Sequence, residues 1–144
     1  MANKDNPLRG AEFEIAVQSF FAKQELRLQR RFPVELGVNQ HKATHFFDLG
    51  SDNPPILVEC KCHCWTEGGN SPSAKMSVWN EAMYYFSLAP PNFRKIFVVL
   101  KSLRANSSLA NHYISRFGHL IPRGVEMWQY DILSTTGAVI FSAR

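Results

Sequence analysis

Between residues 95 and 101 the chain carries five successive apolar residues, Ile96–Leu100, with a lysine on each side. Such a run is typical of a strand buried on both faces in the middle of a mixed sheet. A strand of this kind must be covered by other elements on both sides. We therefore expect an α/β fold in which a mixed β-sheet is flanked by helices.

Hydrophobic periodicity and turn residues predict the remaining elements. Phe13, Val17 and Phe20 recur at helical spacing within Gly10–Gln24, which predicts an amphipathic helix. The full set is helices over 10–24, 73–88 and about 107–117, and strands over 28–38, 41–49, 56–65, 95–101, 125–133 and 138–142. The order is α, β, β, β, α, β and then α, β, β. No repeat or long linker interrupts it, so we expect residues 1–144 to form one domain.

Composition excludes several classes of protein. Hydrophobic residues make up 45% of the 144 positions, which is too many for a disordered chain. No apolar run approaches the roughly 20 residues that a membrane-spanning helix needs. The polar opening, Met1–Gly10, does not resemble a secretory signal, so we expect a cytoplasmic protein. The 16 Lys and Arg exceed the 12 Asp and Glu, which modestly favours a polyanionic partner such as nucleic acid.

The three cysteines, Cys60, Cys62 and Cys64, alternate within one short segment. Their odd number and their spacing disfavour disulfides. On one face of a strand they would pack as small hydrophobic residues. Together with His63 they also offer four zinc ligands, although no second cluster accompanies them. Both interpretations stay open at this point.

Two carboxylates and an amine are expected to converge on one patch of the sheet. Because side chains alternate along a strand, Glu59, Lys61 and His63 should point to the face opposite Cys60. If the preceding strand pairs antiparallel through the turn, Asp48 comes within reach of Glu59. Such a group suits Mg²⁺, which binds few carboxylates and keeps several waters, and it suits phosphodiester hydrolysis. The alternative is that these residues form an ordinary solvated strand face and a turn.

Asp48, ten intervening residues and Glu59-Cys60-Lys61 resemble the signature of the PD-(D/E)XK nuclease superfamily, although Phe47 stands where the family name has Pro. The segment Arg9–Glu14 is similar to the Gly-x-x-x-Glu opening of Holliday-junction resolvases. The resemblance implies a restriction-endonuclease-like three-layer core over about 10–101, of order αβββαβ, with a C-terminal αββ extension over about 102–144. It implies Mg²⁺, with Mn²⁺ as a substitute, held by Asp48, Glu59 and Glu14, and a water assisted by Lys61. Glu12 would replace Glu14 if the register slipped.

Further residues are expected to contact nucleic acid. Asn80 and Tyr84 are similar to the Gln-x-x-x-Tyr motif of the exonuclease branch, with Asn in place of Gln. His63 lies beyond Lys61 on the same expected face. Lys75, Arg30 and Arg31 are candidates for phosphate contacts. We expect the protein to be a small DNA endonuclease. A homodimer is a possible assembly, because one site cuts one strand. The rival hypothesis is a non-catalytic nucleic-acid-binding or assembly protein with the same fold.

Overall fold

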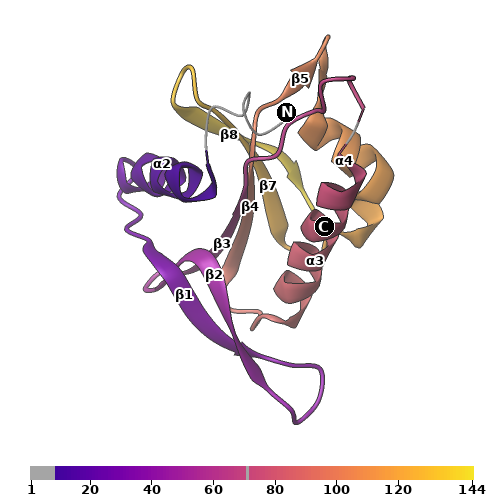
Figure 1. Cartoon of the computed structure of the whole chain (residues 1–144). Helices are drawn as coiled ribbons and strands as arrows, with labels where there is room; N and C mark the ends of the chain where they lie inside the picture. The colour runs from indigo at the N-terminus through magenta and orange to yellow at the C-terminus, as the bar shows by residue number, and fades with distance from the viewer. Residues whose placement is uncertain (1–8, 71) are drawn as a thin grey trace.

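The computed structural model describes residues 9–70 and 72–144 of the chain. A six-stranded mixed sheet of order β1-β2-β3-β4-β7-β8 forms its centre, with three helices against it (Figure 1). The elements are α2 (Gly10–Ala22), β1 (Gln29–Leu36), β2 (Ala43–Asp52), β3 (Pro55–Lys61), α3 (Ser73–Leu88), β4 (Arg94–Leu100), β5 (Leu103–Arg104), β6 (Ser107–Ser108), α4 (Leu109–Phe117), a 3-10 turn (Gly118–Leu120), β7 (Val125–Asp131) and β8 (Thr136–Ser142). The predicted α/β class and the mixed sheet flanked by helices are confirmed.

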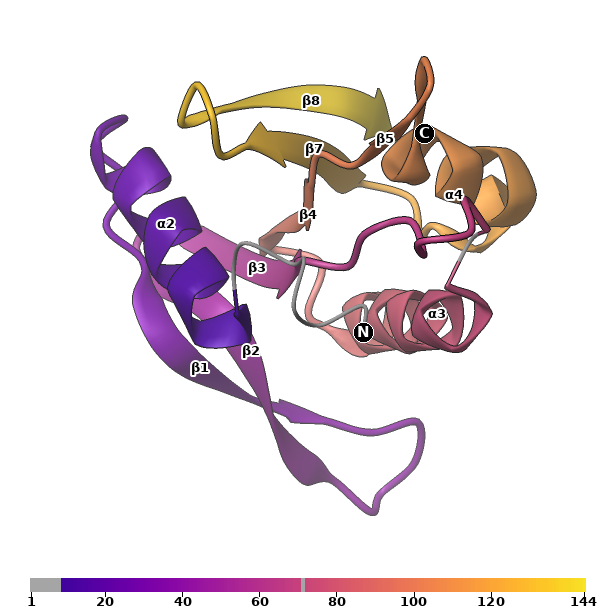
Figure 2. The same cartoon turned by 45° about the horizontal axis from the view of Figure 1, so that its top comes forward.

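The directions of the strands follow from the connections between them. β3, β4 and β7 are parallel neighbours, joined by crossovers through α3 and α4. β1, β2 and β8 run antiparallel to their neighbours through tight connections. Figure 2 shows α2 on one face of the sheet and both α3 and α4 on the other.

The sheet separates two hydrophobic cores. Phe13, Val17 and Phe21 of α2 pack with Val58, Cys60, Ile96 and Val98 on one face. On the other face, side chains of α3 and α4 pack with Leu57, Phe97 and Val99. Successive residues of β3 and β4 therefore enter different cores, which explains why the apolar run of β4 has no polar position. No helix in the described part of the chain is long and apolar enough to cross a membrane.

Several boundaries differ from the sequence-based prediction. β3 ends at Lys61, not Trp65, because its pairing with β4 stops at Val99 and the Trp65 N–H bonds to Ser102 Oγ at 3.1 Å instead. Pro72 is the N-cap of α3, since its carbonyl accepts the N–H groups of residues 75 and 76. Ser108 caps α4, with its Oγ accepting from Asn111 N at 3.0 Å. The short β5–β6 hairpin was not predicted.

β2 leaves β3 halfway along its length. It pairs with β3 only from Leu49 to Asp52, and its first part pairs with β1 alone. The β1–β2 hairpin therefore extends beyond the sheet as a two-stranded arm, residues 32–47, visible in Figure 1. The regular alternation of side chains between the two faces of the sheet breaks at this point. Phe47 and Leu49 are two residues apart in β2 and yet enter opposite cores. Arg31, with φ of 54°, lies opposite the break in β1.

Gly50 permits the close approach of Phe32 at the same place. A Cβ at this position would lie 2.5 Å from Cγ of Phe32, so the ring occupies the space that any other side chain would need. The point where β2 separates from β3, which we call the fork, places Asp48 beside β3, within hydrogen-bond distance of its backbone.

Candidate active site

Asp48 and Glu59 face each other across the fork. Cys60 N–H donates to Asp48 Oδ2 at 2.8 Å, and Asp48 N–H donates to Glu59 Oε1 at 3.3 Å. In a regular antiparallel ladder, carbonyl oxygens of the neighbouring strand would accept such amides. Here carboxylates take that place, which holds both side chains in fixed positions. Asp48 Oδ1 and Glu59 Oε2 take no part in these bonds.

The fork concentrates negative charge in a poorly solvated place. Glu59 is only 5% exposed. Burial and, next, the charge of Glu59 raise the pKa of Asp48 from 3.8 to about 7, with Glu14 adding to the effect. The Cys60 N–H and the Lys61 ammonium oppose this rise but do not cancel it. A bound cation would relieve the repulsion that the protein alone leaves in place.

His45 belongs to the site, although sequence reasoning did not single it out. Its Nε2 lies 3.4 Å from Glu59 Oε1, within reach of a hydrogen bond. Its ring stacks on Tyr85 of α3 with centroids 3.8 Å apart and planes at 13°, and it meets the edge of Phe47 at 4.6 Å. Two aromatic rings thus fix the imidazole against the carboxylate. Its position three residues before Asp48 was the sole sequence signal, since the contact with Tyr85 joins distant segments.

Glu14 lies near the fork but has a partner of its own. Arg30 Nη2 donates to Glu14 Oε1 at 3.0 Å, so one predicted metal ligand is paired with one predicted phosphate contact. Glu14 is half-buried and still close enough to raise the pKa of Asp48. Glu12 is exposed on α2. The structure therefore brings Asp48 and Glu59 together and leaves Glu14 beside them.

Lys61 and His63 follow Glu59 along the chain. Lys61 ends β3 opposite Val99. His63 Nδ1 accepts the indole N–H of Trp79 at 2.8 Å, so a neutral His63 carries its proton on Nε2. Burial, together with the charges of Lys61 and Lys75, lowers the pKa of His63 to about 4. His63 is thus a neutral group held by α3, close to the ammonium groups of Lys61 and Lys75.

Three other predicted contacts are directed elsewhere in the structure. Asn80 Oδ1 accepts from the hydroxyl of Tyr113 at 2.8 Å, which links α3 to α4. Tyr84 is 57% exposed, while the next residue, Tyr85, faces the fork. The guanidinium of Arg31 lies 4.7 Å above the ring of Phe46 on the arm.

The cysteines do not form the zinc site that the sequence left open. Cys60, Cys62 and Cys64 pack on the α2 side of the sheet, whereas His63 bonds to α3 on the other side. Burial and the neighbouring carboxylates raise the pKa of Cys60 well above its ordinary value, which keeps it a thiol. Within residues 9–70 and 72–144, no three His, Cys, Asp or Glu side chains are grouped as a metal site. The predicted metal ligands Asp48, Glu59 and Glu14 do not form such a group either, so Asp48 and Glu59 remain as a pair.

Comparison of the chain with known protein families, with curated protein sequences and with solved structures gives no match.

Proposed function

We propose that this protein is a metal-dependent nuclease of the PD-(D/E)XK type that hydrolyses phosphodiester bonds in DNA. The observation that carries the proposal is the pair of carboxylates at the fork, Asp48 and Glu59, with Lys61 two residues further along β3. The element order and the two-sided helix packing are compatible with a restriction-endonuclease-like three-layer core. The β7–β8 segment with α4 would then be an extension of that core.

The donors at the fork suit Mg²⁺ or Mn²⁺. Mg²⁺ takes oxygen ligands and is commonly held by one or two carboxylates, with waters completing its shell. Asp48 and Glu59 each tie one oxygen to a backbone amide and keep the other out of these bonds. Burial and, next, repulsion by Glu59 raise the pKa of Asp48, and a divalent cation would favour its ionised form against both effects. When bound, the cation would polarise the phosphodiester and lower the pKa of a bound water.

The side chains of this chain would have distinct roles. Asp48 and Glu59 would hold the cation, and the Lys61 ammonium would orient the attacking water and offset negative charge that develops on the phosphate. His45 does not touch substrate in this scheme. It is a positioning residue that donates from Nε2 to Glu59 and keeps that carboxylate aimed at the fork. Glu14 strengthens the negative field from α2.

Cleavage assays test the proposal directly. Purified protein would be incubated with supercoiled plasmid, linear duplex, single strands and a four-way junction, in Mg²⁺, Mn²⁺ or chelator. We expect metal-dependent cleavage that is lost in Asp48→Asn, Glu59→Gln and Lys61→Met. Asp52→Asn is the matched control, because Asp52 is an exposed carboxylate at the other end of the β2–β3 pairing. Folded protein that cuts no substrate, or cleavage that survives in Lys61→Met and Glu59→Gln, would refute the mechanism.

Assembly and compartment are part of the same proposal. One site cuts one strand, so cleavage of both strands would require a homodimer, which sedimentation in the presence of duplex would detect. Cys60, Cys62 and Cys64 form no disulfide, which suits the reducing cytoplasm.

A further inference from the structure

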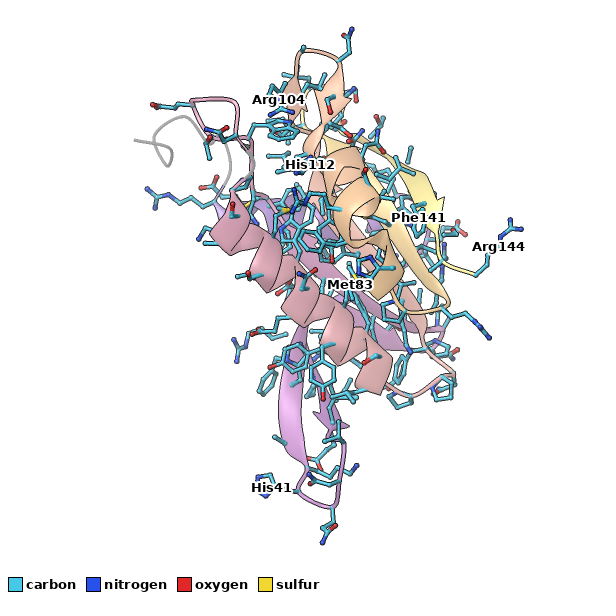
Figure 3. The ribbon with its side chains drawn as sticks, turned by 90° about the vertical axis from the view of Figure 1, so that its right-hand side faces the viewer. His41, Met83, Arg104, His112, Phe141 and Arg144 are labelled. Carbon is cyan, nitrogen blue, oxygen red and sulfur yellow. The ribbon has the colours of Figure 1, made fainter. Side chains whose placement is uncertain are left out.

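The arm formed by β1 and β2 has one covered face and one open face. Phe32, Leu36 and Phe47 enter the core that the sheet shares with α3. None of residues 32–47 belongs to the core on the α2 side, so the other face of the arm packs on neither core in the described part of the chain. Figure 3 shows the arm projecting past α3, with His41 at its tip. The arm therefore presents an open surface next to the fork.

Phe46 lies on this open face. The residues on either side of it in β2, His45 and Phe47, both contact aromatic rings of α3. Because side chains alternate along a strand, Phe46 points away from α3. It is 46% exposed, although phenylalanine is among the residue types most often buried. A single exposed apolar side chain is common on protein surfaces, so the neighbours and the position of Phe46 decide what it can do.

The charged neighbour of Phe46 is Arg31. Its guanidinium lies 4.7 Å from the centroid of the Phe46 ring, which is a cation–π contact. No carboxylate forms an ion pair with Arg31 in the described part of the chain. Glu35, on the same arm, accepts instead from Thr44 Oγ1 at 3.0 Å. Arg31 is exposed, so its uncompensated charge is accessible to a phosphate group.

This aromatic and cationic pair lies next to the fork on both strands. In the register of β1 with β2, Arg31 is opposite Asp48. Phe46 is two residues before Asp48, roughly 7 Å along β2. A stacked nucleic-acid strand rises about 3.4 Å per nucleotide, so the separation corresponds to about two nucleotides. A strand with a phosphate at the fork would therefore bring a neighbouring base to the ring of Phe46.

We propose that Phe46 and Arg31 form a platform for an unpaired base of the nucleic acid, with the base stacked on the ring and the guanidinium on a neighbouring phosphate. This inference rests on the nuclease function proposed above, and it narrows the substrate to DNA with unpaired nucleotides, such as single strands, flaps and bulges. An aromatic ring stacks on any base, because every base has a flat π-face. Within an intact duplex the bases are stacked on one another, so the ring cannot reach their faces.

Binding is measured by fluorescence anisotropy in chelator, so that the result does not depend on cleavage. The probes are a labelled oligothymidylate, an abasic oligomer of the same length and charge, and a labelled duplex. Wild type should bind the oligothymidylate more tightly than the abasic oligomer, and Phe46→Leu should reduce this preference roughly tenfold. Phe46→Tyr keeps an aromatic ring and should retain the preference. Arg31→Gln should weaken the binding of both oligomers alike and lower the salt slope by about 0.7, as for one phosphate contact.

The control has the same exposure in another part of the sheet. Val139 is also 46% exposed, and it lies on β8 at the edge of the sheet opposite β1. Val139→Ala should change the preference for bases less than about twofold. Phe46→Leu should leave the affinity for duplex unchanged, since its effect depends on unpaired bases. Urea unfolding of each variant verifies that the fold is intact.

The outcomes separate the platform from the nuclease. A preference for bases that persists in Phe46→Leu, or that falls equally in Val139→Ala, would overturn the platform. An equal loss of affinity for duplex and for single strands in Phe46→Leu would overturn the assignment to unpaired bases. Metal-dependent cleavage together with an unchanged preference in Phe46→Leu would refute the platform alone. Binding that depends on bases and on Phe46, without any cleavage, would support the platform and refute the nuclease.

Discussion

Replacing Asp48 by Asn is expected to stabilise the metal-free protein while abolishing its proposed activity. The side chain keeps its shape, and the Asn amide oxygen can still accept the Cys60 N–H that Asp48 accepts at 2.8 Å. What disappears is a negative charge that is half-buried beside Glu59. The substitution therefore separates the structural role of this residue from its electrostatic cost.

The magnitude follows from the pKa of Asp48. Each pKa unit corresponds to about 1.4 kcal/mol, so a rise from 3.8 to about 7 destabilises the fully ionised folded state by about 4 kcal/mol. Because the folded pKa lies above the unfolded one, the folded state binds the proton more tightly. The destabilisation is absent below pH 3.8, grows as the pH rises, and is complete above pH 7. At a pH of about 5 it amounts to about 2 kcal/mol.

Urea unfolding in chelator at pH values of about 8 and about 5 measures the effect. Asp48→Asn should exceed wild type by up to about 4 kcal/mol at the higher pH and by about half as much at the lower. His63 also affects the pH dependence of stability, but it is common to both proteins and cancels in the difference. Asp52→Asn controls for loss of a carboxylate, and added Mg²⁺ should stabilise wild type but not Asp48→Asn. An Asp48→Asn variant no more stable than wild type at the higher pH, or a difference that grows at the lower pH, would refute the electrostatic argument.

Other predictions concern the neighbours of the fork. His45→Ala should weaken Mn²⁺ binding about tenfold by calorimetry, and His45→Gln should recover part of it, since Gln can donate to Glu59; equal losses in both would contradict a positioning role. An NMR titration of His63 should give a midpoint near pH 4. Because this folded-state pKa lies below the ordinary value of 6.5, the contribution of His63 to stability should be lost as the pH falls from 6.5 toward 4. A midpoint at or above the ordinary value would contradict the burial of His63. Trp79→Phe removes the donor to His63 Nδ1 and should cost about 1–3 kcal/mol in urea unfolding, whereas an unchanged midpoint would mean that this bond is not formed. Purified protein should contain no stoichiometric zinc by elemental analysis and should stay folded in chelator; a full equivalent of zinc would contradict the separation of His63 from the cysteines.

Regular periodicity accounts for the parts of the structure that the sequence predicted well. The apolar run of β4 indicated a strand buried on both faces, and its residues do enter two cores. Alternation along β3 correctly separated Glu59 from Cys60. Both inferences rely on a strand that keeps its two-residue period, and β3 and β4 keep it.

The parts that were not predicted depend on departures from that period and on long-range contacts. The break at Asp48 lies opposite a positive φ at Arg31, a residue type that gives no local sign of such a conformation. The stacking of His45 on Tyr85 joins β2 to the far half of α3. The Glu14–Arg30 ion pair is equally non-local, and it turned a predicted metal ligand toward a protein partner. The spacing of Glu12 and Glu14 along the helix does not determine which of them pairs with Arg30.

The fork also has a mechanical consequence. Only four residue pairs of β2 with β3 join the hairpin to the sheet by backbone hydrogen bonds, and the arm continues for five further pairs, roughly 17 Å. Along that length the arm packs on α3 instead, through Phe32, Leu36 and Phe47 in the shared core and through the stack of His45 on Tyr85. Asp48 lies at the base of the arm, and Glu59 lies on β3. Because the arm packs on α3, a substitution in that shared core that shifts the arm would also move Asp48 relative to Glu59, without touching either carboxylate.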